Sequence, residues 1–183
     1  MVDFLESRVK GWEGGVDGYL AKIENARKAG LAKRERDEKA RKEAAKKVPP
    51  KTDATSTPAG FTDNLDEALA KAKAEGKLVY ACFSGSDWCG FCIMLEKEVL
   101  SDPLFVAGVT DDYVLVFIDS PRDKSRLSER AKAENGKLKA KYGIRGYPTA
   151  LILDGDGKKV GETGYRQGGA AEYVKHLKSF RRK

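Results

Sequence analysis

The segment Lys77–Cys92, KLVYACFSGSDWCGFC, decides how the rest of the chain is interpreted. It opens with a continuous apolar run, Lys77–Phe83, which lies between turn signals and predicts a strand buried on both faces. The apolar residues that follow the second cysteine have helical spacing and predict a helix over 89–100. Cys89 and Cys92 therefore lie where a buried strand passes into a helix, and a Cys-x-x-Cys pair in that context indicates redox chemistry.

The predicted helix start gives the two cysteines different roles. Cys89 would lie beside free N–H groups, which together with the helix dipole favour a thiolate. Cys92 follows one turn later, close enough to form a disulfide with Cys89. A reactive thiolate followed by a resolving thiol is what thiol–disulfide exchange requires. We therefore expect Cys89 to attack a substrate disulfide and Cys92 to resolve the mixed disulfide.

Two alternatives for the cysteine pair stay open, a metal site and a purely structural pair. The chain has three cysteines and one histidine, His176. Zinc takes four ligands, and no second Cys-x-x-Cys pair accompanies the first, so we expect no metal. His176 is interpreted as a surface or packing residue, which excludes histidine-based acid–base catalysis. The third cysteine, Cys82, is interpreted as a small buried apolar residue, with an alternative disulfide to Cys89 or Cys92 as the other interpretation.

Residues 1–47 are expected to form a charged, helical N-terminal extension. Over residues 5–30, apolar or small residues recur at alternating spacings of four and three, the heptad pattern of a helix–helix seam. The seam consists of Leu5, Val9, Trp12, Val16, Tyr19, Ile23, Ala26 and Gly30. The helix could pack on its own domain, join a second copy as a homo-oligomer, or form a poorly ordered arm.

The next two segments separate this extension from the rest of the chain. Residues 31–47 hold eight basic and four acidic residues with almost no apolar stripe, which indicates a solvated helical spacer. Interleaved acids and absent aromatics argue against nucleic-acid binding. Residues 48–60, VPPKTDATSTPAG, contain three of the six prolines and are interpreted as a linker.

Residues 61–183 have the pattern of a compact α/β domain. The predicted helices are 63–73, 89–100, the charged residues 121–143, and 170–180. The predicted strands are 77–83, 113–118, 149–153 and, after a hairpin turn at 154–157, 158–161. This order predicts a mixed sheet covered by helices.

Composition limits what the chain can be. Its 183 residues, 40% of them hydrophobic and 34% charged, suit one core plus an appendage. No run of 18 apolar residues exists, so we expect no membrane span. The first residues lack the apolar core of a signal peptide, which favours the cytoplasm unless a leader was trimmed.

Two motifs resemble the thioredoxin family. WCGFC, Trp88–Cys92, is similar to the family's W-C-x-x-C site, and KYGIRGYPT, Lys141–Thr149, is similar to the segment that carries its cis-proline. The resemblance covers residues 61–180. It implies a thioredoxin-like α/β fold with the helical N-terminal extension added. It also implies catalysis by Cys89 and Cys92, without a cofactor beyond their redox-active disulfide.

The resemblance also implies how a client would bind. Pro148 would be the cis-proline beside the cysteines, exposing the backbone of Tyr147 for pairing with an extended substrate. Trp88 would flank the site as a stacking surface or serve packing alone. The implied substrate-binding residues are therefore Trp88, Gly90, Phe91, Tyr147 and Pro148. Asp87 would tune the Cys89 thiol, accept a proton through water, or cap the loop.

Three features depart from housekeeping thioredoxins. Their buried acid is replaced by Cys82, whose thiol is a poor base because burial raises its pKa. Their partner lysine on the next strand is replaced by Leu115 or a neighbour. The dipeptide between the cysteines is Gly-Phe. Asp119, at the end of that next strand, is interpreted as a turn or cap residue.

These features together predict a thiol–disulfide oxidoreductase acting on protein disulfides or thiols, as a reductase fed by an upstream thiol donor. One alternative is an isomerase or oxidase, served by an upstream oxidant and oligomerised through residues 5–30. Another is a binding module whose thiols matter little. The Ser-Gly-Ser-Asp lead-in is similar to exported bacterial relatives, which would place the protein in the periplasm if a leader was removed.

Overall fold

The computed structural model describes residues 15–48 and 56–182. Contacts divide them into two compact units, the first ending at Lys42 and the second spanning Glu43–Lys183. Most of the first unit is one helix, α2, which spans Gly15–Ala45 and whose last residues belong to the second unit. Residues 5–14 of the predicted seam lie outside the described residues. Exposed ion pairs between residues four apart lie along this helix, for example Lys28 with Glu24 at 2.9 Å.

The second unit is built on a four-stranded sheet of order β2-β1-β3-β4. Its strands are β1 (Leu78–Ser84), β2 (Tyr113–Asp119), β3 (Thr149–Leu153) and β4 (Lys159–Thr163). β1 lies parallel to β2 and antiparallel to β3, and β4 is antiparallel to β3. The sheet is therefore mixed, as predicted, with β1 in its centre.

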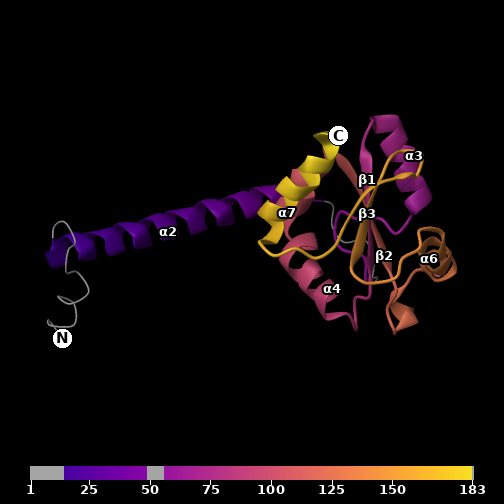
Figure 1. Cartoon of the computed structure of the whole chain (residues 1–183), viewed down its shortest axis with the longest axis horizontal. Helices are drawn as coiled ribbons and strands as arrows, with labels where there is room; N and C mark the ends of the chain where they lie inside the picture. The colour runs from indigo at the N-terminus through magenta and orange to yellow at the C-terminus, as the bar shows by residue number, and fades with distance from the viewer. Residues whose placement is uncertain (1–14, 49–55, 183) are drawn as a thin grey trace. The chain divides into compact units, whose positions relative to one another are not determined.

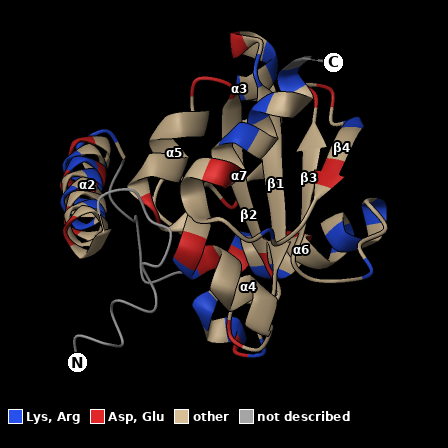
Figure 2. Cartoon of the chain, turned by 60° about the vertical axis from the view of Figure 1, so that its left-hand side comes forward, with Lys and Arg blue, Asp and Glu red and all other residues tan. Residues whose placement is uncertain are grey.

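Helices cover both faces of the sheet (Figures 1 and 2). They are α3 (Leu65–Glu75), α4 (Gly90–Leu95) with a π-helical turn (Glu96–Leu100), α5 (Pro103–Val109), α6 (Glu129–Lys141) and α7 (Gly169–Lys178). α3 and α6 cover one face, and α4, α5 and α7 the other. Alternate residues of β1 enter the two cores: Tyr80 and Cys82 join one, and Val79, Ala81 and Phe83 the other. The central strand is buried on both sides for this reason.

Two expectations about local structure were incomplete. The charged stretch 121–143 becomes α-helical only at Glu129, after a short 3₁₀ turn at Lys124–Arg126. Helix α5 was not predicted at all. Its start carries a recognisable signal, because Asp102 caps it by accepting from the Leu104 N–H at 3.0 Å and Pro103 occupies its first turn.

The described part of the expected linker packs against the domain. Ser56 and Pro58 are buried, and the Ser56 N–H donates to the Arg126 carbonyl at 3.2 Å. Gly60 has φ +83°, and a Cβ there would lie 2.7 Å from Val106. Glycine therefore permits both the turn and the close approach to α5. Residues 49–55 of the linker lie outside the described residues.

Candidate active site

Cys89 and Cys92 form a disulfide where β1 passes into α4, with their Cα atoms 5.2 Å apart. Cys89 is the N-cap residue of α4, and its Sγ accepts the Cys92 N–H at 3.3 Å. The Sγ of Cys92 accepts the N–H of Gly85 at 3.5 Å. Cys89 is 9% exposed and Cys92 only 1%. Each sulfur thus has a backbone donor that would favour its thiolate, and Cys89 is the more accessible.

The loop that carries the cysteines is hydrogen-bonded to the segment after β2. The Ser120 N–H donates to the Ser84 carbonyl at 2.8 Å. The Asp87 carboxylate accepts the N–H groups of Arg122 and Asp123, both at 3.0 Å. The indole Nε1 of Trp88 donates to the Ser120 carbonyl at 2.9 Å. We call these two segments, Ser84–Trp88 and Asp119–Asp123, the paired loops.

Asp119 anchors the paired loops from inside the protein. Its carboxylate accepts the Ser86 N–H at 3.0 Å and the Ser86 hydroxyl at 2.6 Å, and it is 2% exposed. Asn135 of α6 donates to its carbonyl at 2.8 Å. The expectation of a mere turn or cap residue understated this role. The serine two positions after the strand was the available signal, since a buried carboxylate needs such donors.

Asp87 has the loop-capping geometry. The Asp123 and Arg122 N–H groups hold the pKa of its carboxyl below the ordinary value. The carboxyl is therefore ionised at neutral pH and is occupied by the loop that it caps. An effect of this charge on Cys89 stays a prediction.

Gly85 and two aromatic residues form one wall of the site. The Trp88 ring packs edge-on against that of Tyr147, with centroids 5.6 Å apart. A Cβ on Gly85 would lie 2.5 Å from the Trp88 ring, so glycine permits this placement. The Tyr147–Pro148 peptide bond is cis, and the next residue, Thr149, pairs with Phe83 of β1. This pairing brings the proline segment beside the strand that leads to the cysteines.

The other side of the disulfide is apolar and open. Phe91 is 61% exposed, and its ring lies 5.8 Å from that of Tyr165. Ile93 and Met94 of α4 are also exposed. Gly90 is exposed, and a Cβ added there would meet open space. These residues leave room for a polypeptide beside the sulfurs.

Cys82 lies beneath this site in the sheet core. It is fully buried, and burial raises the pKa of its thiol to about 12. Its neighbours across the sheet are Phe117 on β2 and Ala150 on β3. Leu115 pairs instead with Tyr80. Uncharged residues thus occupy the positions that we compared with the acid–lysine pair of housekeeping thioredoxins.

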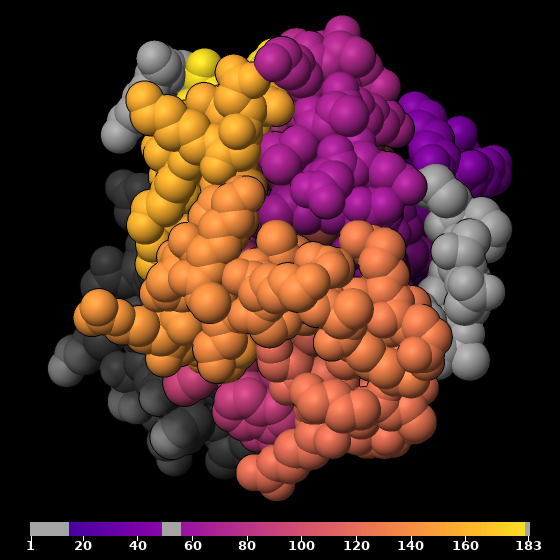
Figure 3. All heavy atoms as spheres, turned by 90° about the vertical axis from the view of Figure 1, so that its right-hand side faces the viewer, coloured from indigo at the N-terminus to yellow at the C-terminus, as the bar shows by residue number. Residues whose placement is uncertain are grey.

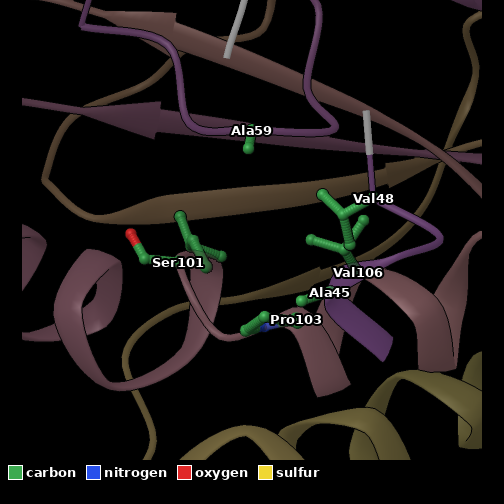
Figure 4. Close-up of a pocket in the computed structure, with 7 residues that line it drawn as sticks. Ala45, Val48, Ala59, Ser101, Pro103 and Val106 are labelled. Atoms are coloured by element: carbon green, nitrogen blue, oxygen red, sulfur yellow. The ribbon is translucent and has the colours of Figure 1, made fainter. Parts of the chain in front are cut away.

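The remaining candidates lie apart from the disulfide. His176 packs between Tyr173 and Phe180 and bonds to Thr163 at 2.9 Å. Within residues 15–48 and 56–182 there is no cluster of three His, Cys, Asp or Glu side chains placed to hold a metal ion. No helix in the same ranges could cross a lipid bilayer. A cavity of about 240 Å³ lies near the start of α5 and contains no residue of the site (Figure 4).

A disulfide at the start of the helix that follows a central buried strand defines the site of a thiol–disulfide oxidoreductase of thioredoxin type. Residues 65–181 match the family described as a thioredoxin-like domain, and the chain belongs to this family. The fold, the family and the oxidoreductase activity predicted from the sequence are therefore confirmed.

Named relatives agree with this assignment. The disulfide bond reductase DsbH of Chlamydia pneumoniae is 34% identical over 117 residues, 64% of this chain and 70% of that protein. The thioredoxin-related protein DsbJ of the same organism is 31% identical over 97 residues, 53% of this chain and 28% of that protein. A solved structure named DsbH Oxidoreductase has a TM-score of 0.61 at 29% identity, covering 71% of this chain and 93% of that one.

Removing the Asp119 carboxylate should destabilise the domain more than removing an exposed carboxylate nearby. Asp119→Ala leaves the buried Ser86 N–H and hydroxyl without their acceptor, at a cost of about 3 kcal/mol. Asp123→Ala removes an exposed cap of a short turn and should cost about 1 kcal/mol. Urea unfolding of both variants measures the difference. Equal losses would show that Asp119 does not anchor the paired loops.

The buried Cys82 thiol should make stability depend on pH in the alkaline range. Its pKa is about 12 when folded and 9.0 ordinarily, so above pH 9 the unfolded chain releases a proton that the folded chain retains. Stability should therefore fall as pH rises from 9 to 12. Cys82→Ala should lower the free energy of unfolding by about 1 kcal/mol at pH 7. The stability of this variant should then fall less steeply with rising pH than that of the wild type.

Chemical denaturation between pH 7 and 11 measures both curves. Tyr80, Tyr113 and Tyr173 also have raised pKa values, mainly because of burial. They are present in both proteins, but the Cys82 thiol is among the groups that raise the pKa values of Tyr80 and Tyr173, so the difference in slope reports on Cys82 together with these two neighbours. Parallel curves would contradict the assignment of a buried, neutral thiol.

Proposed function

We propose that this chain reduces disulfide bonds in client proteins and that an external dithiol then reduces its own Cys89–Cys92 disulfide again. The observation that carries the proposal is the disulfide between Cys89 and Cys92, with the more exposed sulfur at the start of α4. The direction is supported by the relative named a disulfide bond reductase. No cofactor beyond the two cysteines is required.

The reaction begins with both cysteines reduced. The Cys89 thiolate attacks one sulfur of the client disulfide, a new sulfur–sulfur bond forms, and the other client sulfur leaves as a thiolate that takes a proton from water. Cys92 then loses its proton to water, and its thiolate attacks the Cys89 sulfur. The Cys89–Cys92 bond forms, and the second client sulfur leaves. Two electrons have passed to the client, and an external dithiol must restore the protein.

The chain's own residues support these steps. The Cys92 N–H stabilises the Cys89 thiolate before attack, and the Gly85 N–H stabilises the Cys92 thiolate before resolution. The Tyr147 backbone, beside the cis-proline, would pair with the extended client. Trp88 and Phe91 would contact the client on either side of the sulfurs. Cys82 takes no part, since its thiol stays protonated at neutral pH.

Cysteine substitutions test the proposal directly. With dithiothreitol as donor, the wild-type chain should reduce insulin disulfides. Cys89→Ser should lose at least about 100-fold of the rate above background, because it removes the attacking thiolate. Cys92→Ser should trap mixed disulfides with the client. Cys82→Ala is the matched control and should stay within about twofold of wild type.

Activity that survives Cys89→Ser would contradict the proposal and favour a binding module. The reduction potential of the Cys89–Cys92 pair then tests direction. A value near about −270 mV supports reduction, and one between about −180 and −120 mV supports an isomerase or oxidase instead.

A second candidate, a self-associating isomerase, is favoured by apolar residues exposed on α2. Ile23 is 49% exposed in the first unit, and Leu20 and Leu31 are similarly open. Exposed apolar residues on a helix with a heptad pattern favour pairing with a second helix. Two catalytic domains held together would raise the effective concentration of catalytic sites around one client.

Sedimentation of the full chain distinguishes this candidate. Self-association predicts a dimer or larger species that becomes a monomer in Ile23→Asp/Ala26→Asp, because charges at two seam positions oppose pairing. Ala21→Asp/Asn25→Asp, which adds the same two charges at exposed positions outside the seam, should leave the oligomer intact. A monomeric wild-type chain would exclude the oligomeric isomerase.

A further inference from the structure

We propose that this protein selects clients that carry acidic residues beside their disulfide, through a basic rim of three side chains. The rim consists of Arg122, Lys139 and Arg145, all exposed. The inference rests on the proposed reduction of client proteins and names the chemistry that the same site prefers.

The Lys139 side chain and the backbones of Arg122 and Arg145 lie close to the residues of the Trp88–Tyr147 wall. The Arg122 N–H bonds to Asp87, the residue before Trp88, at 3.0 Å. Lys139 of α6 places its Nζ 5.2 Å from the centroid of the Tyr147 ring. Arg145 lies two residues before Tyr147 in the loop that leads to the cis-proline. The rim therefore lies along the side of the site where the client backbone would pair.

The rim side chains have no acidic partner in the described part of the chain. No carboxylate there lies within 4.0 Å of the cationic nitrogens of Arg122, Lys139 or Arg145. The two nearby acids are engaged, since Asp87 accepts two backbone N–H groups and Asp123 bonds to Ser125. The rim cations are therefore available to a carboxylate from outside.

The positive charge of the surrounding segment strengthens the attraction of the rim for acidic clients. Residues 120–147 contain nine Lys and Arg against three Asp and Glu, a balance of +6. Basic residues recur along α6 (Figure 2), and this segment forms much of one face of the molecule (Figure 3). A field of one sign beside a site raises the local concentration of oppositely charged partners.

The opposite side of the disulfide differs in character. Its exposed residues are apolar, with Phe91 the most open, and its charges are mixed. Glu98 bonds to Tyr165 there at 2.8 Å, and Lys97 is exposed beside it. A preferred client would therefore place carboxylates against the rim and apolar residues against Phe91.

Matched peptides test this preference with the full chain. Two synthetic peptides each contain one disulfide, flanked by Asp and Glu in one and by Asn and Gln in the other. Protein reduced beforehand with dithiothreitol is freed of reductant and mixed with each peptide. The measured quantity is the second-order rate constant for loss of the peptide disulfide, so no upstream donor enters the comparison.

The acidic peptide should react about fivefold faster at low ionic strength, and less than about twofold faster in about 0.5 M salt, where charges are screened. Lys139→Gln/Arg145→Gln should lose most of the advantage. Lys158→Gln/Lys178→Gln should retain it. These control lysines lie at the other end of the sheet, where Leu153 pairs with Val79 and Tyr113 bonds to Leu177.

The outcomes separate the two proposals. Equal rates for both peptides at low salt, or an advantage that survives in Lys139→Gln/Arg145→Gln, would overturn the basic rim while leaving the reductase in place. If the reduced wild-type protein reacts with neither peptide, the proposed reduction itself fails, and the preference fails with it.

Discussion

The hydrogen bonds between the paired loops are the constraint on which the site depends. Ser84, Asp87 and Trp88 bond to the segment that follows β2, and Ser86 bonds to Asp119, the last residue of β2. A disulfide at the end of a strand would otherwise lie on a loop free to move. Because the Asp119 side chain is buried and both of its oxygens accept from Ser86, breaking these bonds costs more than breaking those of an exposed side chain. The position of Cys89 at the start of α4 is thereby fixed by residues that take no part in the chemistry.

The buried acidic side chain of this site lies at the end of β2 and not in the sheet beneath the cysteines. Cys82 and Phe117 leave the sheet beneath the cysteines uncharged. The buried carboxylate belongs instead to Asp119, where Ser86 rather than a thiol occupies both of its oxygens. Backbone N–H groups then become the donors that stabilise each thiolate. Thiolate stability in this site depends on loop geometry more than on a neighbouring proton acceptor.

The sequence was sufficient to predict the fold and the site where its patterns report on burial. The unbroken apolar runs of β1 and β2 are typical of strands covered on both faces, which the structure shows them to be, and the cysteine pair after such a run indicates the chemistry. Sequence patterns were insufficient where partners come from distant segments. Ser86, two positions after β1, offers a donor, but local spacing does not identify Asp119 as its partner, nor does it give the packing of Gly60 on Val106. Helix α5 was missed for another reason, because its seven residues are too few for a periodic pattern.

The residues that support the thiol chemistry are different from those that we propose select the client. The sulfurs depend on buried groups and backbone donors, whereas the rim cations are exposed side chains of residues close to the Trp88–Tyr147 wall. A change at Arg145 can alter which client approaches without altering the bond that is broken. Electrostatic selection acts mainly on the rate of encounter, and thiol exchange acts after contact. The exposed rim that we propose for client selection can therefore be substituted without removing the buried groups and backbone donors on which the sulfurs depend.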